Sequence, residues 1–537
     1  MFEQQLVTAL AAVRTHRNKL LPVNRLPNEV LSIAFRMMQP NLPSFLLLPS
    51  TGSRYDLRTS AWEAVSTVCR KWREASLSSP SLWSIIDSTS VNPYLYLKRS
   101  CSVPLTLYAG ISRPVTNFSQ VFLHAVTASI SRFKEVHLDI GKCSGIGNLT
   151  MFEDPAPALE SLTIATSGKR RQRFGHALPA LFNGQTPKLR QLNVEHFTSW
   201  SGNHFADLTH LCLYNQHTTG RPTLSQFIDF IETCPRLQEL ALVAAGPTID
   251  NVSSANEHRL VALDHLRELT IGRWSSSLMV SAFLSQLLLP RTVHMYLWND
   301  HSDTDMDDLS IMIPADCSHL RNMEGIHEVR YQHIEGIHGI ISLDGVLYIH
   351  DNFDTNQILT AMSRALVLNN LEHVSLHDVS STPYGRDDWR RLFAALPSLQ
   401  RLRISSKTSR AAISALSSDT MEIPLCAHLK HLTVVADHNL PALFLCAFAA
   451  ERAAQQCPVE TLTIMRKEQV ESNEWGSSTG DSPHTYAPED FQFLSKYVEH
   501  VEHVDSAMKW WMTPPSWPNP AYSWTTRKED PWHGWKR

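Results

Sequence analysis

The chain has 537 residues and a mass of 60.7 kDa, which corresponds to three or four globular domains at about 150 residues per domain. Hydrophobic residues make up 43% and charged residues 19%, and this composition excludes a chain that is disordered over most of its length. The formal net charge is −4 at pH 7, so there is no overall basic excess of the kind that a nucleic-acid-binding protein carries.

Cysteine usage favours a reducing compartment, and hydropathy argues against a membrane-spanning segment. The nine cysteines form no C-x-x-C pair, and the N-terminus has no basic segment followed by an apolar core. The longest apolar stretch, Leu440–Ala450, is much shorter than the roughly 20 residues that span a bilayer. We therefore expect a cytoplasmic or nuclear protein without a membrane segment.

The first ninety residues predict a small all-α module. Residues 1–20 form an amphipathic helix with Leu6, Leu10 and Val13 on one side. A second helix follows over residues 26–35, with proline near its start, and a third is predicted over Ala61–Leu77. The third helix has an apolar stripe at positions 65, 68, 72 and 75. We assign residues 21–90 to this module and expect residues 36–60 to be a loop.

Three motifs in this module resemble those of the F-box. They are Leu-Pro-x-Glu-Val-Leu at 26–31, Val-Cys-Arg-x-Trp-Arg at 68–73 and Pro-x-Leu-Trp at 80–83. The chain departs from the family pattern at Ala34, where a larger aliphatic residue is usual. The resemblance implies a partner rather than a reaction, because an F-box binds a Skp-type adaptor and through it a cullin–RING ubiquitin ligase.

An apolar-x-x-apolar-x-apolar element recurs ten times further along the chain. Its copies begin at Phe133, Leu159, Leu189, Leu208, Leu237, Leu266, Leu371, Leu399, Leu429 and Val459. The alternation in the last four residues of each copy predicts a short strand with one buried face. Since one strand cannot bury that face alone, the copies are expected to stack on one another.

The segments between the copies have helical patterning. Thr223–Cys234, Ser281–Leu289 and Asp388–Leu396 each place apolar residues on one helical stripe. A strand plus a helix in about 30 residues resembles a leucine-rich repeat. The predicted fold is thus an α/β leucine-rich-repeat solenoid over residues 91–504, preceded by a small all-α F-box bundle. The closest resemblance is to fungal, basidiomycete-type F-box proteins with such repeats.

Three parts of the chain depart from this pattern. Residues 292–350 are irregular, with degenerate copies at Ile326–Tyr331 and Leu343–Tyr348, and Asp303–Asp308 is expected to be an acidic loop. Residues 467–490 predict a polar loop. Residues 505–537 are rich in tryptophan and proline, and either cap the end of the repeats or bind a partner.

The resemblance assigns candidate residues to two surfaces. By position in the F-box motif, the residues expected to contact the adaptor are Leu26, Pro27, Val30, Leu31 and Phe35. The alternative is that these residues form only the bundle core. The non-apolar strand positions face the concave side of a solenoid, where a protein substrate would bind. The substrate-contact candidates there are Tyr214, Glu239, Glu268, His373, His377, Arg401, Arg403 and His431.

The charge of this face is expected to change along the chain. Its first half is weakly acidic, and its second half is richer in histidine and arginine. A row containing His373, Arg401 and His431 would suit an acidic or phosphorylated segment, whereas the alternative is an ordinary solvated surface.

The sequence contains no recognisable catalytic motif, and we expect neither a cofactor nor a metal ion. His500 and His503 could share a helix face, but two ligands do not make a metal site. The expected function is therefore a non-enzymatic substrate receptor of a ubiquitin ligase. The alternatives are a repeat scaffold without ligase association, and a hydrolase or transferase centred on residues 292–350.

Overall fold

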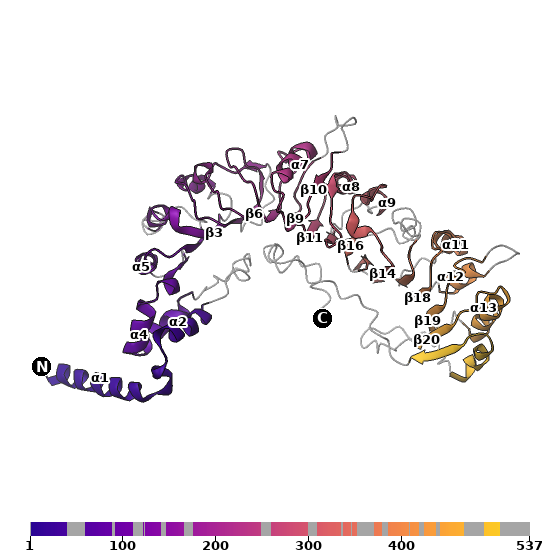
Figure 1. Ribbon diagram of the computed structural model, residues 1–537, viewed down its shortest axis with the longest axis horizontal. Helices are drawn as coiled ribbons and strands as arrows, with labels where there is room; N and C mark the ends of the chain where they lie inside the picture. Colours follow the sequence, from indigo (N-terminus) through magenta and orange to yellow (C-terminus); the bar gives the residue numbers. More distant parts are fainter. Residues whose placement is uncertain are drawn as a thin grey trace, which may run out of the picture. The chain divides into compact units, whose positions relative to one another are not determined.

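The structure is a computed structural model with mixed α/β architecture, in which parallel sheets are accompanied by helices (Figure 1). The residues described are 2–39, 59–87, 92–110, 122, 124–140, 146–165, 175–248, 259–298, 309–334, 337–344, 346–351, 370–378, 385–406, 409–417, 424–436, 441–466 and 488–504. They fall into two compact units, one up to Thr248 and the other from Arg259 onward, and each is described by itself.

The first unit begins with a series of helices, of which α1 is the longest. They are α1 (Phe2–Leu20), η1 (Pro22–Arg25), α2 (Asn28–Met37), η3 (Thr59–Ala64), α3 (Val65–Val68), α4 (Arg70–Leu77), η4 (Pro80–Trp83) and, after the first strand, α5 (Pro93–Arg99). The predicted N-terminal helix is confirmed as α1, but none of its residues is buried, so its apolar side is uncovered.

The prediction of one continuous helix over Ala61–Leu77 is wrong. Cys69 has extended backbone angles, φ −157° and ψ 170°, and separates α3 from α4. Its Sγ accepts a hydrogen bond from the backbone N–H of Trp72 at 3.5 Å, so the thiol caps the new helix. Val68, placed by the sequence in an apolar stripe, consequently lies exposed at the end of α3.

A parallel sheet follows in the first unit, with its strands in chain order. Its strands are β1 (Ile85–Asp87), β2 (Leu105–Gly110), β3 (Phe133–Asp139), β4 (Ser161–Ala165), β6 (Gln191–Glu195), β8 (His210–Tyr214) and β9 (Glu239–Val243). Smaller elements are η5 (Ile130–Arg132), η6 (Ile146–Met151), η7 (Phe182–Gly184), α7 (Leu224–Glu232) and the pair β5 (His176–Ala177) with β7 (Phe197–Ser199). The sheet therefore starts inside the segment predicted to be all-helical, at β1.

The second unit has a sheet whose order departs from chain order once. Its strands are β11 (Glu268–Gly272), β13 (His294–Trp298), β14 (Glu328–Ile334), β15 (Ile337–Leu343), β16 (Leu347–Asp351), β17 (His373–Asp378), β18 (Arg401–Ser406), β19 (His431–Ala436), β20 (Thr461–Arg466) and β21 (His500–Val504). β13 pairs with β16, and β14 pairs with β17, both in parallel. Between them β16, β15 and β14 form an antiparallel meander.

Helices in the second unit lie on one side of this sheet, as α11 to α13 do beside β18 to β20 (Figure 1). They are α8 (Ser277–Leu284), α9 (Leu309–Met312), η8 (Arg321–Met323), α11 (Arg386–Ala394), α12 (Ser409–Leu416), α13 (Ala442–Ala454) and η9 (Pro488–Lys496). α8 ends earlier than the sequence predicts because Leu287 and Leu288 form a short strand, β12, against β10 (Val261–Ala262).

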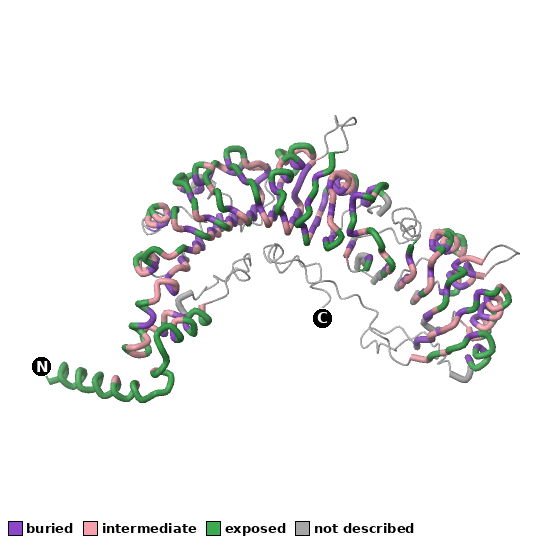
Figure 2. Tube along the Cα trace, in the orientation of Figure 1, coloured by how far each residue is buried: buried purple, intermediate pink, exposed green. Residues whose placement is uncertain are grey.

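All ten copies of the sequence element form strands, and their register aligns the apolar positions. In the first unit, for example, Val136, Leu162, Leu192, Leu211 and Leu240 are successive register partners, and each is at most 1% exposed. Figure 2 shows buried stretches along the strands, and in β6, β8 and β9 the last four residues are all buried. Each apolar side chain is therefore covered by its counterparts in the neighbouring strands.

The antiparallel meander preserves these rows. Met295 pairs with Leu347, Leu347 with Leu343, Leu343 with Val329 and Val329 with Val374. The predicted degenerate copy at 326–331 has the register that the structure shows. In the copy at 343–348, the last predicted apolar position is displaced by one residue from the buried position. Tyr348 was assigned to the core, whereas its neighbours on either side, Leu347 and Ile349, are the buried residues.

Buried polar side chains connect segments that are separated in the sequence. In the first unit the Gln216 amide donates to the Phe197 carbonyl at 2.6 Å and accepts from the Gly246 N–H at 2.9 Å. In the second unit the buried guanidinium of Arg452 donates to the carbonyls of Leu425 and Cys426, each at 2.8 Å. These bonds satisfy backbone N–H and carbonyl groups that would otherwise be buried without partners.

Several expectations fall outside the described residues. These are the acidic loop 303–308, nearly all of the polar loop 467–490, most of the loop 36–60 and the tail 505–537. Among the helices that are described, none combines the length and apolarity that crossing a bilayer requires.

Replacing Leu211 by alanine tests the role of the apolar rows. Leu211 is fully buried on β8, so the truncation is expected to lower the free energy of unfolding of the first unit by about 2–5 kcal/mol. The control is His210→Ala on the same strand, which removes a half-buried side chain and is expected to cost less than about 1 kcal/mol. Urea unfolding followed by circular dichroism measures both, and equal losses would contradict the proposed packing.

Candidate functional site

The three F-box-like motif segments come together in one helical bundle. Lys71 Nζ donates to the backbone carbonyls of Asn24 (2.8 Å) and Leu26 (2.7 Å). Trp72 Nε1 donates to the side-chain carbonyl oxygen of Asn24 at 2.8 Å. The second motif thus fixes the chain just before α2, where the first motif begins.

Aromatic packing completes this bundle. The ring of Phe35 lies 5.2 Å from that of Trp72, measured between centroids. Behind them Trp83, from the third motif, packs edge-on against Trp62 and Tyr96, and the guanidinium of Arg99 lies 4.2 Å from the centroid of the Trp83 ring. Trp83 and Trp62 are at most 2% exposed, so they belong to the core rather than to a binding surface.

The residues predicted for adaptor contact separate into two groups. Leu31 and Phe35 are only 1% and 2% exposed and form the buried side of α2, which corrects their assignment to the contact surface. They are packed inside the bundle and cannot reach a partner without unfolding it. Leu26, Pro27 and Val30 are exposed, so their assignment stays a prediction.

The exposed side of α2 contains two apolar residues that the sequence analysis missed. Val30, Ile33 and Met37 are 43%, 58% and 81% exposed and are spaced three and four residues apart on α2. This spacing places all three on one stripe, which we call the α2 stripe. The helical period was the signal that pointed to Ile33 and Met37, but the motif alone did not include them.

The outward-facing strand positions of the first unit are less accessible than predicted. Tyr214 is only 1% exposed, which corrects its assignment to substrate contact. Its register partners Glu195 and Val243 are buried as well, so the whole end of this row is covered. Glu239 is half-buried, and its Oε1 lies 3.5 Å from Nε2 of His210 on the adjacent strand.

The acidic character predicted for this face is moderated by histidines. Glu135 lies 3.8 Å from His137, and Glu195 lies 3.6 Å from His196. The hydrogen bond from His137 is the main cause that lowers the pKa of Glu135, outweighing its burial. These carboxylates are therefore engaged within the face rather than forming one open acidic patch.

The second unit brings the predicted basic residues into adjacent strands. Glu328, His373, Arg401 and His431 are successive register partners on one face of β14, β17, β18 and β19. Arg403 follows two positions after Arg401 on the same face, and Glu268 lies half-buried on β11. The side chain of His377 lies outside the described residues, although its backbone belongs to β17.

Arg330 joins this group and was missed by the sequence analysis. It pairs in register with Ser375, which pairs on its other side with Arg403. The pKa of Arg403 is lowered, first by burial and then by the positive charges of Arg330 and Arg401. The degenerate copy at 326–331 contained the signal, because its register places residue 330 on the outward face.

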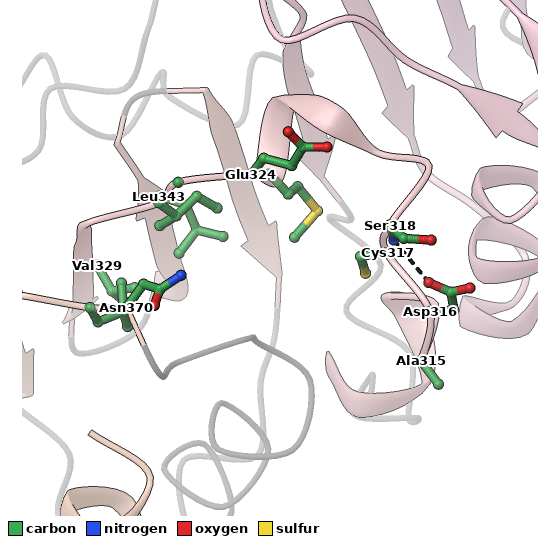
Figure 3. Close-up of a pocket in the computed structure, with 12 residues that line it drawn as sticks. Ala315, Asp316, Cys317, Ser318, Glu324, Val329, Leu343 and Asn370 are labelled. Atoms are coloured by element: carbon green, nitrogen blue, oxygen red, sulfur yellow. Dashed lines mark hydrogen bonds between the residues drawn. The ribbon is translucent and has the colours of Figure 1, made fainter. Parts of the chain in front are cut away.

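A cavity of about 470 Å³ lies beside the meander (Figure 3). Val329, Leu343 and Asn370 line one side, and Asp316, Cys317 and their neighbours line the other. Burial and the nearby Asp316 raise the pKa of Cys317 to about 11, and its thiol donates to the carbonyl of Pro314 at 2.9 Å. This thiol is protonated near neutral pH, so the cavity presents no activated cysteine.

The part of the chain that the structure describes contains no group of three or more potential metal-ligating side chains. His500 and His503 lie on strand β21 rather than on the helix considered from the sequence. Residues three apart on a strand point to opposite faces, so these two imidazoles cannot share an ion.

Iodoacetamide labelling of the native protein at pH 8 tests these thiol environments. Cys101 is exposed and is expected to react first among the described cysteines, whereas Cys212 and Cys426 are buried, with pKa values raised to about 12. Peptide mass spectrometry measures each rate, and urea-unfolded protein, in which all should react, is the control. Labelling of Cys317 as fast as that of Cys101 would reveal a reactive centre in the cavity.

Comparison with known proteins gives limited information. No family model matches the chain, and no curated protein matches it. Among solved structures, a chain in "Crystal structure of Rad7 and Elc1 complex in yeast" aligns over 87% of this chain and 95% of that chain. The identity is 11% and the TM-score 0.22, which is too low to show a shared fold.

Proposed function

We propose that this chain is a non-enzymatic substrate receptor that links a target protein to a ubiquitin ligase. The helical bundle is an F-box that binds a Skp-type adaptor of a cullin–RING ligase, and the strands belong to a leucine-rich-repeat solenoid that captures the target. The observation that supports this most directly is the α2 stripe, an exposed apolar surface on a bundle assembled from the three F-box-like motifs.

The two sides of α2 have different roles in this proposal. Leu31 and Phe35 anchor the helix in the bundle, and Val30, Ile33 and Met37 face away from it. A stripe of large apolar side chains is costly to leave in water, and such surfaces are typical of protein–protein contacts. The stripe is continuous along one helix, which suits docking against the helices of an adaptor.

The strand array supports protein capture rather than small-molecule chemistry. Its outward-facing residues form polar rows across successive strands, and a row of this kind offers contacts to an extended protein segment. Arg401, Arg403, His373 and His431 lie in these rows together with Arg330. Binding and not turnover is therefore the role we assign to this face.

The adaptor contact is tested by the double variant V30D/I33D. Both side chains are exposed, so the bundle should remain folded, while two carboxylates in the apolar contact should weaken adaptor binding by at least about tenfold. The variant R36E, on the same helix but outside the stripe, changes the formal charge by the same two units and should bind normally. Isothermal titration with a purified Skp-type adaptor measures all three proteins.

The outcomes distinguish the proposal from its alternative. Wild-type binding that V30D/I33D does not reduce would place the adaptor contact on another surface, and L26A/P27A would then test the remaining motif residues. No binding by the wild-type protein would instead favour a repeat scaffold without ligase association. Circular dichroism of each variant shows whether the bundle is intact.

A further inference from the structure

Helix α1 is exposed along nearly its whole length (Figure 2), and none of its 19 residues is buried. Its last turn contacts η1, where the side-chain amide of Asn24 donates to the Asn18 carbonyl at 2.7 Å. The half-buried residues of α1 are Thr15 and Asn18. Since most helical stability in proteins comes from packing an apolar side against a neighbour, α1 lacks its main source of stability in a single copy of the chain.

The apolar side of α1 follows the spacing of a coiled coil. Six residues along it are four, three, four, three and four positions apart, which is the spacing of the core positions in such a structure. They are Phe2, Leu6, Ala9, Val13, His16 and Leu20, and all six are exposed. We call this row the α1 seam. Thr15 and Asn18 lie on the opposite side of the helix, so the contact with η1 leaves the seam uncovered.

The α1 seam is complementary to itself when two copies of the helix lie antiparallel and fully overlapped. The core layers then pair Phe2 with Leu20, Leu6 with His16 and Ala9 with Val13 of the second copy. The small Ala9 is thus matched by a branched Val13. A single polar residue in such a core, here His16, fixes the register at some cost in stability.

The residues that flank the seam favour the same orientation. Glu3, Leu10 and Arg17 repeat every seven residues along one flank, and in an antiparallel pair this flank meets itself. Glu3 then faces Arg17 of the second copy at both ends of the pair, and Leu10 faces its counterpart in the middle. A parallel pair would instead bring together the last turns of both helices, which contain Arg17 and Lys19, so charge repulsion opposes it.

We infer that α1 is a self-association surface, which pairs with α1 of a second copy of this chain as a short antiparallel coiled coil. The inference goes beyond the proposed function, because it concerns residues outside the α2 stripe and requires neither adaptor nor target. Two helices of 19 residues form a short seam, so we expect a dimer that forms at micromolar protein concentration and dissociates on dilution.

A lipid surface fits α1 less well than a second copy does. Helices that lie in a membrane interface carry lysine and arginine on the side away from their apolar row. In α1 the residues opposite the seam are neutral, and they include Gln4, Ala11, Thr15 and Asn18. Arg17 and Glu3 lie beside the seam instead, which suits a partner helix that offers the opposite charge at each end.

The oligomeric state of the full-length protein tests the inference. Sedimentation equilibrium over a series of protein concentrations should show a reversible change from the 60.7 kDa monomer to a species of twice that mass. The variant L6D/V13D places two carboxylates in the seam and should weaken association at least about tenfold. Neither side chain is buried, so the helical bundle should remain folded, which circular dichroism checks.

The matched control is Q4D/A11D. It adds two carboxylates with the same spacing of seven residues on the opposite side of α1, and it should dimerise as the wild type does. A wild-type protein that remains monomeric at every concentration would overturn the inference. Equal weakening by Q4D/A11D and L6D/V13D would overturn it as well, because the effect would then not depend on the seam.

Charge reversal tests the orientation of the pair. E3R and R17E should each weaken association several-fold, because each places like charges opposite each other at both ends. The double variant E3R/R17E restores opposite charges across an antiparallel pair and should recover most of the lost affinity. In a parallel pair these positions are about 21 Å apart, so the absence of any recovery would contradict the antiparallel arrangement.

Two further measurements distinguish the other partners that α1 could have. V30D/I33D alters the α2 stripe and should leave the dimer intact, whereas loss of the dimer would assign the partner of α1 to α2 of the second copy and overturn the pairing. Wild-type protein should not co-sediment with vesicles of phosphatidylcholine and phosphatidylserine. Co-sedimentation that L6D/V13D abolishes would assign the seam to a membrane surface instead.

The adaptor titration keeps this inference separate from the proposed function. L6D/V13D should bind the Skp-type adaptor as the wild type does, because the seam and the α2 stripe lie on different helices. A wild-type dimer that binds no adaptor would leave the inference standing while the proposed ligase association fails. A monomeric wild type whose adaptor binding is lost in L6D/V13D would assign the seam to the adaptor and overturn the inference alone.

Discussion

The burial of alternate side chains between neighbouring strands is the interaction on which the rest of this structure depends. Within each unit a leucine or valine on one strand is covered by its register partners on the strands to either side, as Leu192 is by Leu162 and Leu211. A shift of one residue would move every apolar side chain of a strand to the opposite face, so the register is strongly fixed. The same constraint determines which residues face outward, and it therefore positions the candidate binding rows without any need for direct contacts among them.

The meander shows how far this constraint extends. Its three strands run in alternating directions and in reverse spatial order, yet Met295, Leu347, Leu343, Val329 and Val374 still form one buried row. Because strand side chains alternate with a period of two in either direction, an antiparallel pair meets the same burial requirement as a parallel pair. The outward row is preserved for the same reason, and this brings Arg330 beside Ser375 and Arg403 although a regular repeat would have placed different residues there.

Sequence periodicity predicted the strands well because each copy meets the same burial requirement. It failed where a local interaction competed with the period. Cys69 caps α4 with its thiol and interrupts a helix whose apolar spacing appeared continuous. In β16, Leu347 and Ile349 occupy the buried positions instead of the expected Tyr348, because the start of β16 is determined by its antiparallel pairing with β15. Arg330 was missed since it lies in a degenerate copy, although its register was recoverable from Val329 and Tyr331.

Helix α2 poses a different problem, because it has apolar residues on both sides. Leu31 and Phe35 occupy one side, and Val30, Ile33 and Met37 occupy the other. Helical spacing alone cannot decide which side is core, since both satisfy the period. The decision comes from the partners: Phe35 meets the Trp72 ring, and Lys71 and Trp72 hold the chain before the helix at Asn24. Once these contacts orient α2, its second apolar side has to face away from the bundle. The packing that stabilises the module is thus also what leaves the α2 stripe exposed.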